Sequence, residues 1–311
     1  MRILITGVHG FVGANLVAAL STEHSIYGLD IVSPRKKGIR YTFSWDDLDV
    51  PDLIPNVDAI IHLAGKAHDT KNEAEADVYF KVNTDLTIKI FDYFCSHPNI
   101  KKFVFFSTAK AAADKVKEIL TEDVVPAPVG PYGESKIAAE RYILGHQPSG
   151  RQVYIFRPCM IHGPGNKGNL NLLYNVVNKG IPWPLGAFEN RRTFTSVENI
   201  CFAVNGVLTK DVPSGIYNMG DDEALSTNEL IETICAALGK KAHIWRLPKW
   251  LIRCTARVGG WLHLPLNPER LRKLTENYIS SNVKIKAALG VDRLPVRAKD
   301  GLKRTIESFK G

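Results

Sequence analysis

The N-terminal segment MRILITGVHGFVGANLVAALS (residues 1–21) indicates how this chain folds. Its apolar run 2–6 is typical of a buried strand, and 11–21 carries apolar residues at helical spacing. The glycines between them permit a tight turn, a close approach of backbone to a ligand, and packing of the helix on the strand. The helix then directs its free N–H groups toward phosphate. This order predicts a dinucleotide site formed by Gly7, Gly10, Phe11, Val12 and Gly13.

The second apolar run, SIYGLD (25–30), ends in Asp30. An acidic residue at this position accepts hydrogen bonds from both adenosine ribose hydroxyls, which favours NAD over NADP. Arg35, Lys36 and Lys37 follow soon after and could instead meet a 2′-phosphate. We favour NAD and keep NADP as the alternative.

Apolar runs of strand length alternate with stretches of helical periodicity up to residue 158. The further strands are expected at 25–30, 59–65, 102–107 and 152–158, and further helices at 76–96 and 132–144. This alternation predicts an α/β fold, a Rossmann-type doubly wound parallel sheet covered on both faces. After residue 158, loops rich in Gly, Pro and Asn break the rhythm. We expect an NAD-binding Rossmann domain at 1–158, to which later strands return, and a smaller, interleaved substrate lobe at 159–311.

The composition narrows the class of protein. The 311 residues are 45% hydrophobic, enough for a substantial core, and the net charge is +8. Lys and Arg are spread along the chain without a nucleic-acid-binding motif, so we expect anionic small-molecule substrates and no nucleic acid. The five cysteines form no CxxC pair, which argues against a disulfide framework or a metal site. Gly7 interrupts the N-terminal apolar run, and no run approaches the ~20 residues of a membrane span, so we expect a cytoplasmic protein.

A catalytic group is expected where the strand at 102–107 ends. Ser107 and Thr108 end that strand, and the next helix begins with Tyr132 and Lys136, which share one helical face because they are four residues apart. A phenol with a pKa of ~10 is a poor acid or base at neutral pH, and a nearby ammonium moves that pKa toward the working range. A hydroxyl at a strand end completes a clamp on the reacting oxygen. We predict Thr108, Tyr132 and Lys136 to be catalytic.

Further motifs extend over most of the chain: HLAG (62–65), VN (82–83), RPCMIHGPG (157–165), NL (169–170), RTFTSV (192–197) and GIYNMG (215–220). With the two sites above, they resemble the extended short-chain dehydrogenase/reductase family in its NAD-dependent nucleotide-sugar epimerase and dehydratase branch. The resemblance implies additional cofactor contacts from Leu63, Ala64, Gly65, Asn83, Ser107, Tyr132, Lys136 and Pro158. It also implies an adenine contact from either Asp46 or Asp47. The substrate contacts that it implies come from Thr108, Asn169, Leu170, Arg192 and Arg270.

The same resemblance implies a reaction and an assembly. The C-terminal lobe would hold UDP, or another nucleoside diphosphate, over the nicotinamide. Tyr132 would remove the sugar hydroxyl proton while hydride passes to NAD⁺, which gives a 4-keto sugar. An epimerase then returns the hydride to the other face of the sugar. Relatives commonly form a homodimer through two helices of each subunit, and the helices at 76–96 and 132–144 are compatible with this.

Departures from the family pattern narrow the reaction. Dehydratases carry an Asp-Glu pair after the catalytic threonine, where this chain has Ala109 and Lys110. Met160 stands where many 4-epimerases have asparagine. The segments STAK (107–110), GPGNKGN (163–169) and NRRTF (190–194) look most like a bacterial surface-polysaccharide subgroup.

Our first hypothesis is therefore an NAD-dependent 4-epimerase of a UDP-N-acetylhexosamine. The alternative is an NAD(P)H-dependent reductase of a UDP-4-keto-6-deoxy-sugar. A more distant one is a non-catalytic, redox-sensing Rossmann protein, a class that often lacks the tyrosine or lysine.

The stretch PKWLIRCTARVGGWLHL (248–264) is basic and amphipathic. Lys249, Arg253 and Arg257 recur every four residues, and Trp250 and Trp261 lie on the other side. We interpret it as a helix of the substrate lobe with solvated charges. Contact with an anionic membrane is the alternative, because such helices can lie on lipid surfaces.

Overall fold

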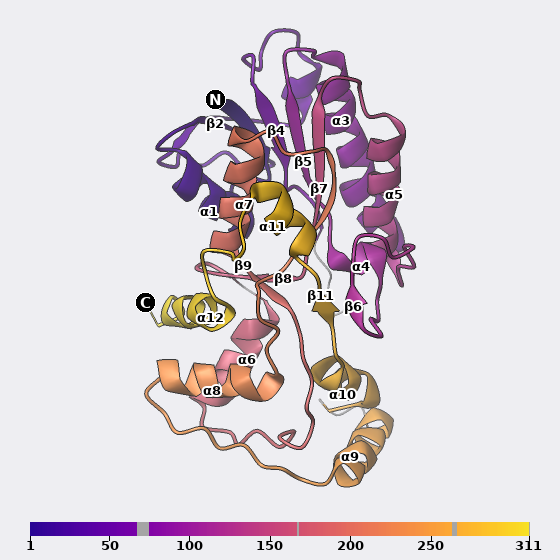
Figure 1. Cartoon of the computed structure of the whole chain (residues 1–311), viewed down its shortest axis with the longest axis vertical. Helices are drawn as coiled ribbons and strands as arrows, with labels where there is room; N and C mark the ends of the chain where they lie inside the picture. Colours follow the sequence, from indigo (N-terminus) through magenta and orange to yellow (C-terminus); the bar gives the residue numbers. More distant parts are fainter. Residues whose placement is uncertain (67–74, 167, 263–265, 311) are drawn as a thin grey trace.

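The computed structural model describes residues 1–66, 75–166, 168–262 and 266–310, apart from the side chain of Asn169. Its centre is a parallel seven-stranded sheet in the order β10-β7-β5-β4-β1-β2-β3 (Figure 1). The strands are β1 (Arg2–Thr6), β2 (Ser25–Leu29), β3 (Ile39–Phe43), β4 (Ala59–His62), β5 (Lys102–Phe106), β7 (Gln152–Pro158) and β10 (Gly215–Met219). The expected Rossmann-type, doubly wound fold is confirmed.

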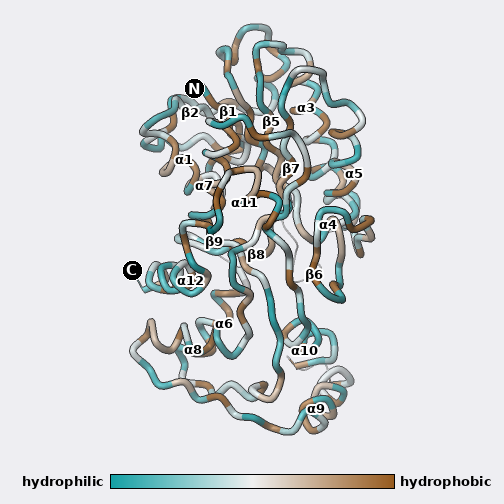
Figure 2. Tube along the Cα trace, in the orientation of Figure 1, coloured by the Kyte–Doolittle hydropathy of each residue, from teal (hydrophilic) through white to brown (hydrophobic). Residues whose placement is uncertain are grey.

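Helices cover both faces of the sheet because its strands are apolar on both sides. Side chains of β1, β4, β5 and β7 point alternately into two separate hydrophobic clusters. One cluster includes α1 (Phe11–Leu20), α7 (Val197–Thr209) and α11 (Val283–Leu289), and the other includes α3 (Leu86–Ser96) and α5 (Pro131–Gly145). The central strands are correspondingly hydrophobic in Figure 2. Near-continuous apolar runs of this kind are typical of a parallel sheet buried on both faces.

The remaining elements pack below the carboxyl ends of the strands (Figure 1). They are the helices α6 (Asn169–Asn178), α8 (Thr227–Ala237), α9 (Lys249–Trp261), α10 (Pro268–Thr275) and α12 (Ala298–Glu307), and the strand pairs β8 (Met160–His162)–β9 (Phe194–Ser196) and β6 (Ile119–Leu120)–β11 (Ile279–Ser280). The five helices share one hydrophobic cluster of their own. We propose the division after Pro158 as a domain boundary, with α7, β10 and α11 returning to the sheet.

The stretch 76–96 is not one continuous α-helix. It consists of α2 (Ala76–Phe80), a π-helical turn η2 (Lys81–Asp85) and α3. The buried Asn83 lies in the π turn, and its side chain bonds to the backbone of Lys66 instead of facing solvent. The wider π turn thus places the Asn83 amide on the inner side of the helix. Single π turns of this kind often occur at functional sites.

None of the helices in the described ranges combines the length and the hydropathy that a bilayer-spanning segment needs.

A buried ion pair connects α5 to the sheet. Arg157 at the end of β7 and Glu140 on α5 are 1% and 0% exposed, and Nη2 of the arginine lies 2.5 Å from Oε2 of the glutamate. Ser107, directly after β5, donates its hydroxyl hydrogen bond to the same carboxylate. The pair therefore ties the helix that carries Tyr132 to two neighbouring strand ends.

We predict that Arg157→Met lowers the free energy of unfolding by ~3–5 kcal/mol, because it leaves the Glu140 carboxylate buried without its counter-charge. The double variant E140L/R157M removes both charges, so its free energy of unfolding should fall by clearly less than that of R157M. Urea denaturation of the wild type and both variants measures this. Equal losses in the single and double variants would show that the uncompensated charge is not the cause.

Candidate active site

The glycine-rich loop between β1 and α1 has the geometry that a bound pyrophosphate requires. Gly7 adopts a positive φ of 66°, and a Cβ there would lie 2.9 Å from the Ala64 nitrogen. A Cβ on Gly13 would lie 2.5 Å from the Gly7 carbonyl oxygen. The helix cap is Gly10, which has no side-chain oxygen to bond the first-turn N–H groups of Phe11, Val12 and Gly13. These features fit a phosphate at the helix N-terminus.

Acidic side chains lie at the ends of β2 and β3, next to this loop. Asp30 accepts hydrogen bonds from the backbone nitrogens of His9 (3.0 Å) and Ile31 (2.8 Å), which holds its carboxylate against the loop. Asp47 accepts from the Ser44 nitrogen at 2.7 Å, whereas Asp46 is exposed. Two backbone N–H groups thus hold in position the carboxylate that is predicted to bind the ribose.

A buried chain of hydrogen bonds connects the strand ends with the catalytic helix. Thr6 Oγ1 lies 2.7 Å from His62 Nδ1, and His62 Nε2 lies 2.8 Å from Thr87 Oγ1. Thr87 donates to the Asn83 carbonyl at 2.7 Å, and the Asn83 amide donates to Ser135 Oγ at 3.1 Å. Burial, followed by the charge of Lys136, lowers the pKa of His62 well below its ordinary value, so the imidazole is neutral at pH 7.

The segment that follows β4, residues 63–65, packs against this chain of hydrogen bonds. The backbone nitrogens of Leu63 and Ala64 donate to Thr6 Oγ1 at 3.2 and 3.0 Å. A Cβ on Gly65 would lie 2.9 Å from Asn83 Oδ1 and 3.1 Å from Lys136 Nζ. The structure therefore brings together three residues predicted to contact the cofactor, Gly65, Asn83 and Lys136, with the glycine backbone exposed above them.

Tyr132, Thr108 and Lys136 are also brought together. The Tyr132 side chain is hydrogen-bonded to Thr108, and its ring meets that of Tyr79 edge-on, with centroids 6.2 Å apart. Lys136 is buried, donates to the Phe106 carbonyl at 2.9 Å and lies 4.9 Å from the centroid of the Phe105 ring. Tyr132 and Thr108 are thus in direct contact, and Lys136 lies one turn further along α5, against the last residues of β5.

The electrostatics of this group differ from our expectation. We expected the Lys136 ammonium to lower the pKa of Tyr132, but burial raises the pKa of that phenol, and the hydrogen bond with Thr108 opposes the rise. Burial also lowers the pKa of Lys136 to about 8, with Glu140 acting in the opposite direction. The cost of burying a charge is therefore the largest influence on the pKa values of both Tyr132 and Lys136.

Two further predicted cofactor residues lie at neighbouring strand ends. Ser107 donates its hydroxyl to Glu140 and its backbone N–H to the Phe156 carbonyl, so its side-chain oxygen can still accept a hydrogen bond. Pro158 ends β7 and is buried. Both positions line the edge of the sheet where ligands bind in open α/β folds.

The predicted substrate residues lie on the other lobe. Asn169 and Leu170 begin α6, and the Leu170 side chain is buried in the lobe core, so its backbone alone can meet a ligand. The backbone of Arg192 forms isolated β-bridges with Leu225 and Tyr278. Its guanidinium donates a hydrogen bond to the Lys273 carbonyl at 2.6 Å. The arginine is thereby held between two segments of the lobe.

The structure distinguishes two arginines of α10. Arg270 is exposed, whereas Arg272 pairs with Glu276 at 3.3 Å and with Asp114 at 3.7 Å. Asp114 follows α4 (Ala109–Ala112), the helix capped by Thr108. Lys110 bonds to the same aspartate at 2.8 Å and lies 5.0 Å from the centroid of the Tyr278 ring. Both arginines lie near the position where the resemblance implies a phosphate contact, whereas sequence reasoning did not single out Lys110 for this region.

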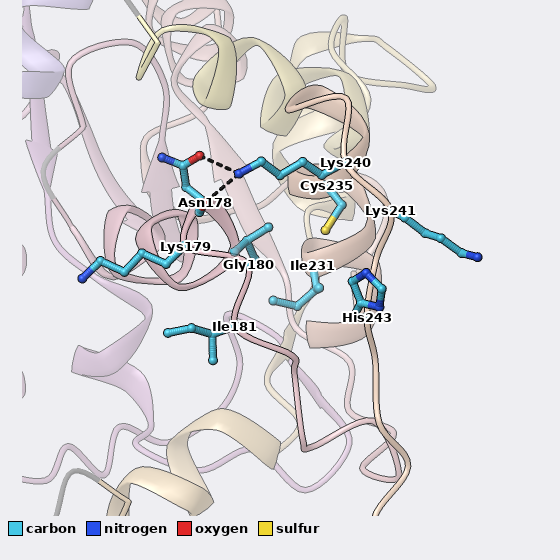
Figure 3. A pocket seen from close by; sticks show the side chains of 10 residues that line it. Asn178, Lys179, Gly180, Ile181, Ile231, Cys235, Lys240, Lys241 and His243 are labelled. Atoms are coloured by element: carbon cyan, nitrogen blue, oxygen red, sulfur yellow. Dashed lines mark hydrogen bonds between the residues drawn. The ribbon is translucent and has the colours of Figure 1, made fainter.

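A separate hollow of about 420 Å³ lies between the end of α6 and α8 (Figure 3). Its lining includes Lys240, Cys235 and His243, and Figure 3 shows Lys240 reaching across to Asn178. Lys240 Nζ donates to the backbone carbonyl of Asn178 at 2.5 Å. None of the predicted catalytic residues lines it, so this hollow is not the catalytic site.

A dinucleotide cradle at one end of a parallel sheet, with a tyrosine, a lysine and a threonine at the adjoining strand ends, defines a Rossmann-type redox enzyme. The chain belongs to the NAD dependent epimerase/dehydratase family, whose model matches residues 3–220. It is therefore an NAD-dependent enzyme of the extended short-chain dehydrogenase/reductase type, and the expected cofactor is confirmed.

The relatives agree with this assignment. A UDP-glucose 4-epimerase of Vibrio cholerae is 29% identical over 99% of this chain and 95% of its own length. An N-acetyl-alpha-D-glucosaminyl-diphospho-ditrans,octacis-undecaprenol 4-epimerase of Escherichia coli O157:H7 is 26% identical over 92% and 84%. The crystal structure of a UDP-glucuronic acid 4-epimerase from Bacillus cereus has the same fold, with a TM-score of 0.75, 20% identity and coverage of 100% and 99%.

We predict that Lys136→Met stabilises the protein at pH 7 and that this advantage shrinks as the pH rises. Because the pKa of Lys136 is lowered from 10.5 to about 8, the unfolded chain holds a proton between these values that the native protein has released. As the pH rises through that range, the free energy of unfolding of the wild type therefore increases relative to that of the variant. The change amounts to about 3 kcal/mol at most.

Urea denaturation of the wild type and K136M at pH 7 and pH 10 measures this difference. Lys89→Met is the matched control, since Lys89 is partly exposed and paired with Asp49 at the surface. A K136M advantage that stays constant or grows with pH would contradict the interpretation of Lys136 as a charge buried at a cost.

Proposed function

We propose that the chain is a 4-epimerase of a UDP-linked N-acetylhexosamine that works through a transient 4-keto sugar. The observation that carries this proposal is the environment of Thr108. Directly after it come Ala109, which offers no acid or base, and Lys110, whose ammonium is paired with Asp114. Water elimination by a dehydratase needs an acid and a base at the sugar, and these two positions supply neither.

The residues that would hold NAD are those of the glycine loop and the strand ends. The backbone N–H groups of Phe11 and Val12 would face the pyrophosphate, and Asp30 the adenosine ribose. Lys136 and the exposed Gly65 backbone adjoin the place where the nicotinamide half would lie. When bound, NAD⁺ would supply a reversible hydride acceptor for C4 of the sugar.

The chain's own groups would handle the proton and orient the sugar. Tyr132 takes the proton of the C4 hydroxyl onto its phenol oxygen and later gives it back. Thr108, already hydrogen-bonded to Tyr132, holds the same sugar oxygen. The ammonium of Lys136, which lies on the same face of α5, stabilises the phenolate when it forms.

The basic group beside the site supports a sugar diphosphate as the substrate. Lys110, Arg192 and Arg272 surround Tyr278 and Asp114, and arginine is well suited to bind phosphate oxygens in pairs. The N-acetylated sugar is favoured by the Escherichia coli relative, which is named for a substrate that joins N-acetylglucosamine through a diphosphate to undecaprenol. Asn169, the backbone of Leu170 and Arg270 remain candidates for further contacts.

We also propose a homodimer that pairs α2–α3 and α5 of two subunits. Exposed apolar side chains on these helices support this arrangement: Val78 and Phe80 on α2, and Leu144 on α5. An anionic substrate and a second copy of the chain are thus the partners that we propose.

The experiment is to incubate the purified protein with UDP-N-acetylglucosamine and no added cofactor. We expect its C4 epimer to form. Tyr132→Phe should lose about 10²–10⁴-fold in rate and still bind NAD, because only the proton-transfer group is removed. Tyr142→Phe is the matched control on the same helix, since its hydroxyl bonds to Asp92 at the surface.

Two results would contradict the proposal. If Y132F turns over as fast as the wild type, Tyr132 is not the group that transfers the proton. Absence of any C4 epimer from UDP-sugars, together with oxidation of NAD(P)H when a UDP-4-keto-6-deoxy-sugar is supplied, establishes the reductase alternative.

A further inference from the structure

Helix α9 lies at the end of the molecule farthest from the central sheet (Figure 1). Only Ile252, Ala256 and Gly259 of its residues are buried, and they form the side that packs on the lobe. The rest of the helix faces outward. Residues 263 and 264, which end the basic amphipathic stretch, lie outside the described residues.

The outward side carries large apolar side chains. Trp261 is 81% exposed, Trp250 66% and Val258 54%. Leu251 and Leu262 are exposed beside them, which makes one continuous stripe at helical spacing. A group of this size is unusual on a surface that meets only water, where exposed apolar residues are ordinarily scattered singly.

A basic stripe borders the apolar one. Lys249, Arg253 and Arg257 follow one another by four residues and are exposed. They line, with Arg272, a hollow of about 470 Å³ between α9 and α10. The stretch 233–268 contains six lysines and arginines and no Asp or Glu, so this stretch is positively charged, and Glu189 is the acidic residue that lines the hollow.

We propose that α9 docks the substrate lobe on an anionic phospholipid bilayer. The helix lies in the plane of the interface with Trp250 and Trp261 at headgroup depth, where tryptophan is enriched in membrane proteins. Lys249, Arg253 and Arg257 meet lipid phosphates, since interfacial helices combine an apolar stripe with Lys and Arg on the polar side. A protein partner is less well matched, because the apolar stripe is bordered by three cations and α9 itself carries no acidic side chain.

Docking through α9 has a consequence for the site. Arg272 lines the hollow next to α9 and also faces Asp114, which follows the helix capped by Thr108. The membrane-facing end and the substrate side of the active site are therefore adjacent. The inference goes beyond the proposed function and does not depend on which sugar is epimerised.

The test is co-sedimentation of the full chain with vesicles. We expect binding to equimolar phosphatidylglycerol–phosphatidylcholine vesicles, little binding to pure phosphatidylcholine, and a fall in binding at high salt. R253Q/R257Q should weaken binding roughly 25-fold, because each basic residue near an anionic surface contributes about 1 kcal/mol and about 1.4 kcal/mol corresponds to a factor of ten. W250S/W261S should weaken it roughly tenfold and also remove the blue shift of tryptophan fluorescence on vesicle addition.

The matched controls are Val283→Ser on α11 and Lys303→Gln on α12, which change an exposed apolar and an exposed basic residue away from α9. Both should bind as the wild type does, and W250S/W261S should keep its activity on a UDP-sugar in the absence of lipid. Equal sedimentation with both vesicle types, or with neither, overturns the proposal. So does a W250S/W261S variant that changes oligomeric state but not vesicle binding, because the stripe would then be an interface between copies.

Discussion

The buried hydrogen-bond chain from Thr6 through His62, Thr87 and Asn83 to Ser135 is the interaction on which the site depends. It crosses from the first strand of the sheet to the helix that carries Tyr132 and Lys136. Each member is buried, so a missing partner would leave a polar group unsatisfied at considerable cost. The cofactor cradle and the catalytic helix therefore keep one relative position.

The same arrangement makes the site costly to maintain. Lys136 keeps its ammonium in a buried position, and Glu140 and Arg157 are held together without solvent only a helical turn away. Buried charges of this kind are typical of active sites, where preorganised charged groups favour the reaction at some cost in stability. Lys110, Arg192 and Arg272 lie around Tyr278 and Asp114, next to the helix capped by Thr108, and we propose that they bind the diphosphate of the substrate.

The sequence predicted the fold well because glycine, apolar runs and helical spacing are local signals. Gly7, Gly10 and Gly13 predicted the turn, and the strands at 2–6, 102–106 and 152–158 match their apolar runs. The roles of Thr6 and Thr87 could not be predicted, because each depends on a partner far away in the chain. Nor could spacing reveal that Ser107 bonds to Glu140, or that burial raises rather than lowers the pKa of Tyr132.

The central claim is that this site removes and returns the same hydrogen at C4 of the sugar. UDP-N-acetylglucosamine carrying deuterium at C4, incubated with the purified protein in ordinary water, tests it directly by NMR and mass spectrometry. The account predicts the C4 epimer with its deuterium retained at C4. An epimer that carries ordinary hydrogen at C4 would contradict the account, because the hydrogen would then have exchanged with solvent.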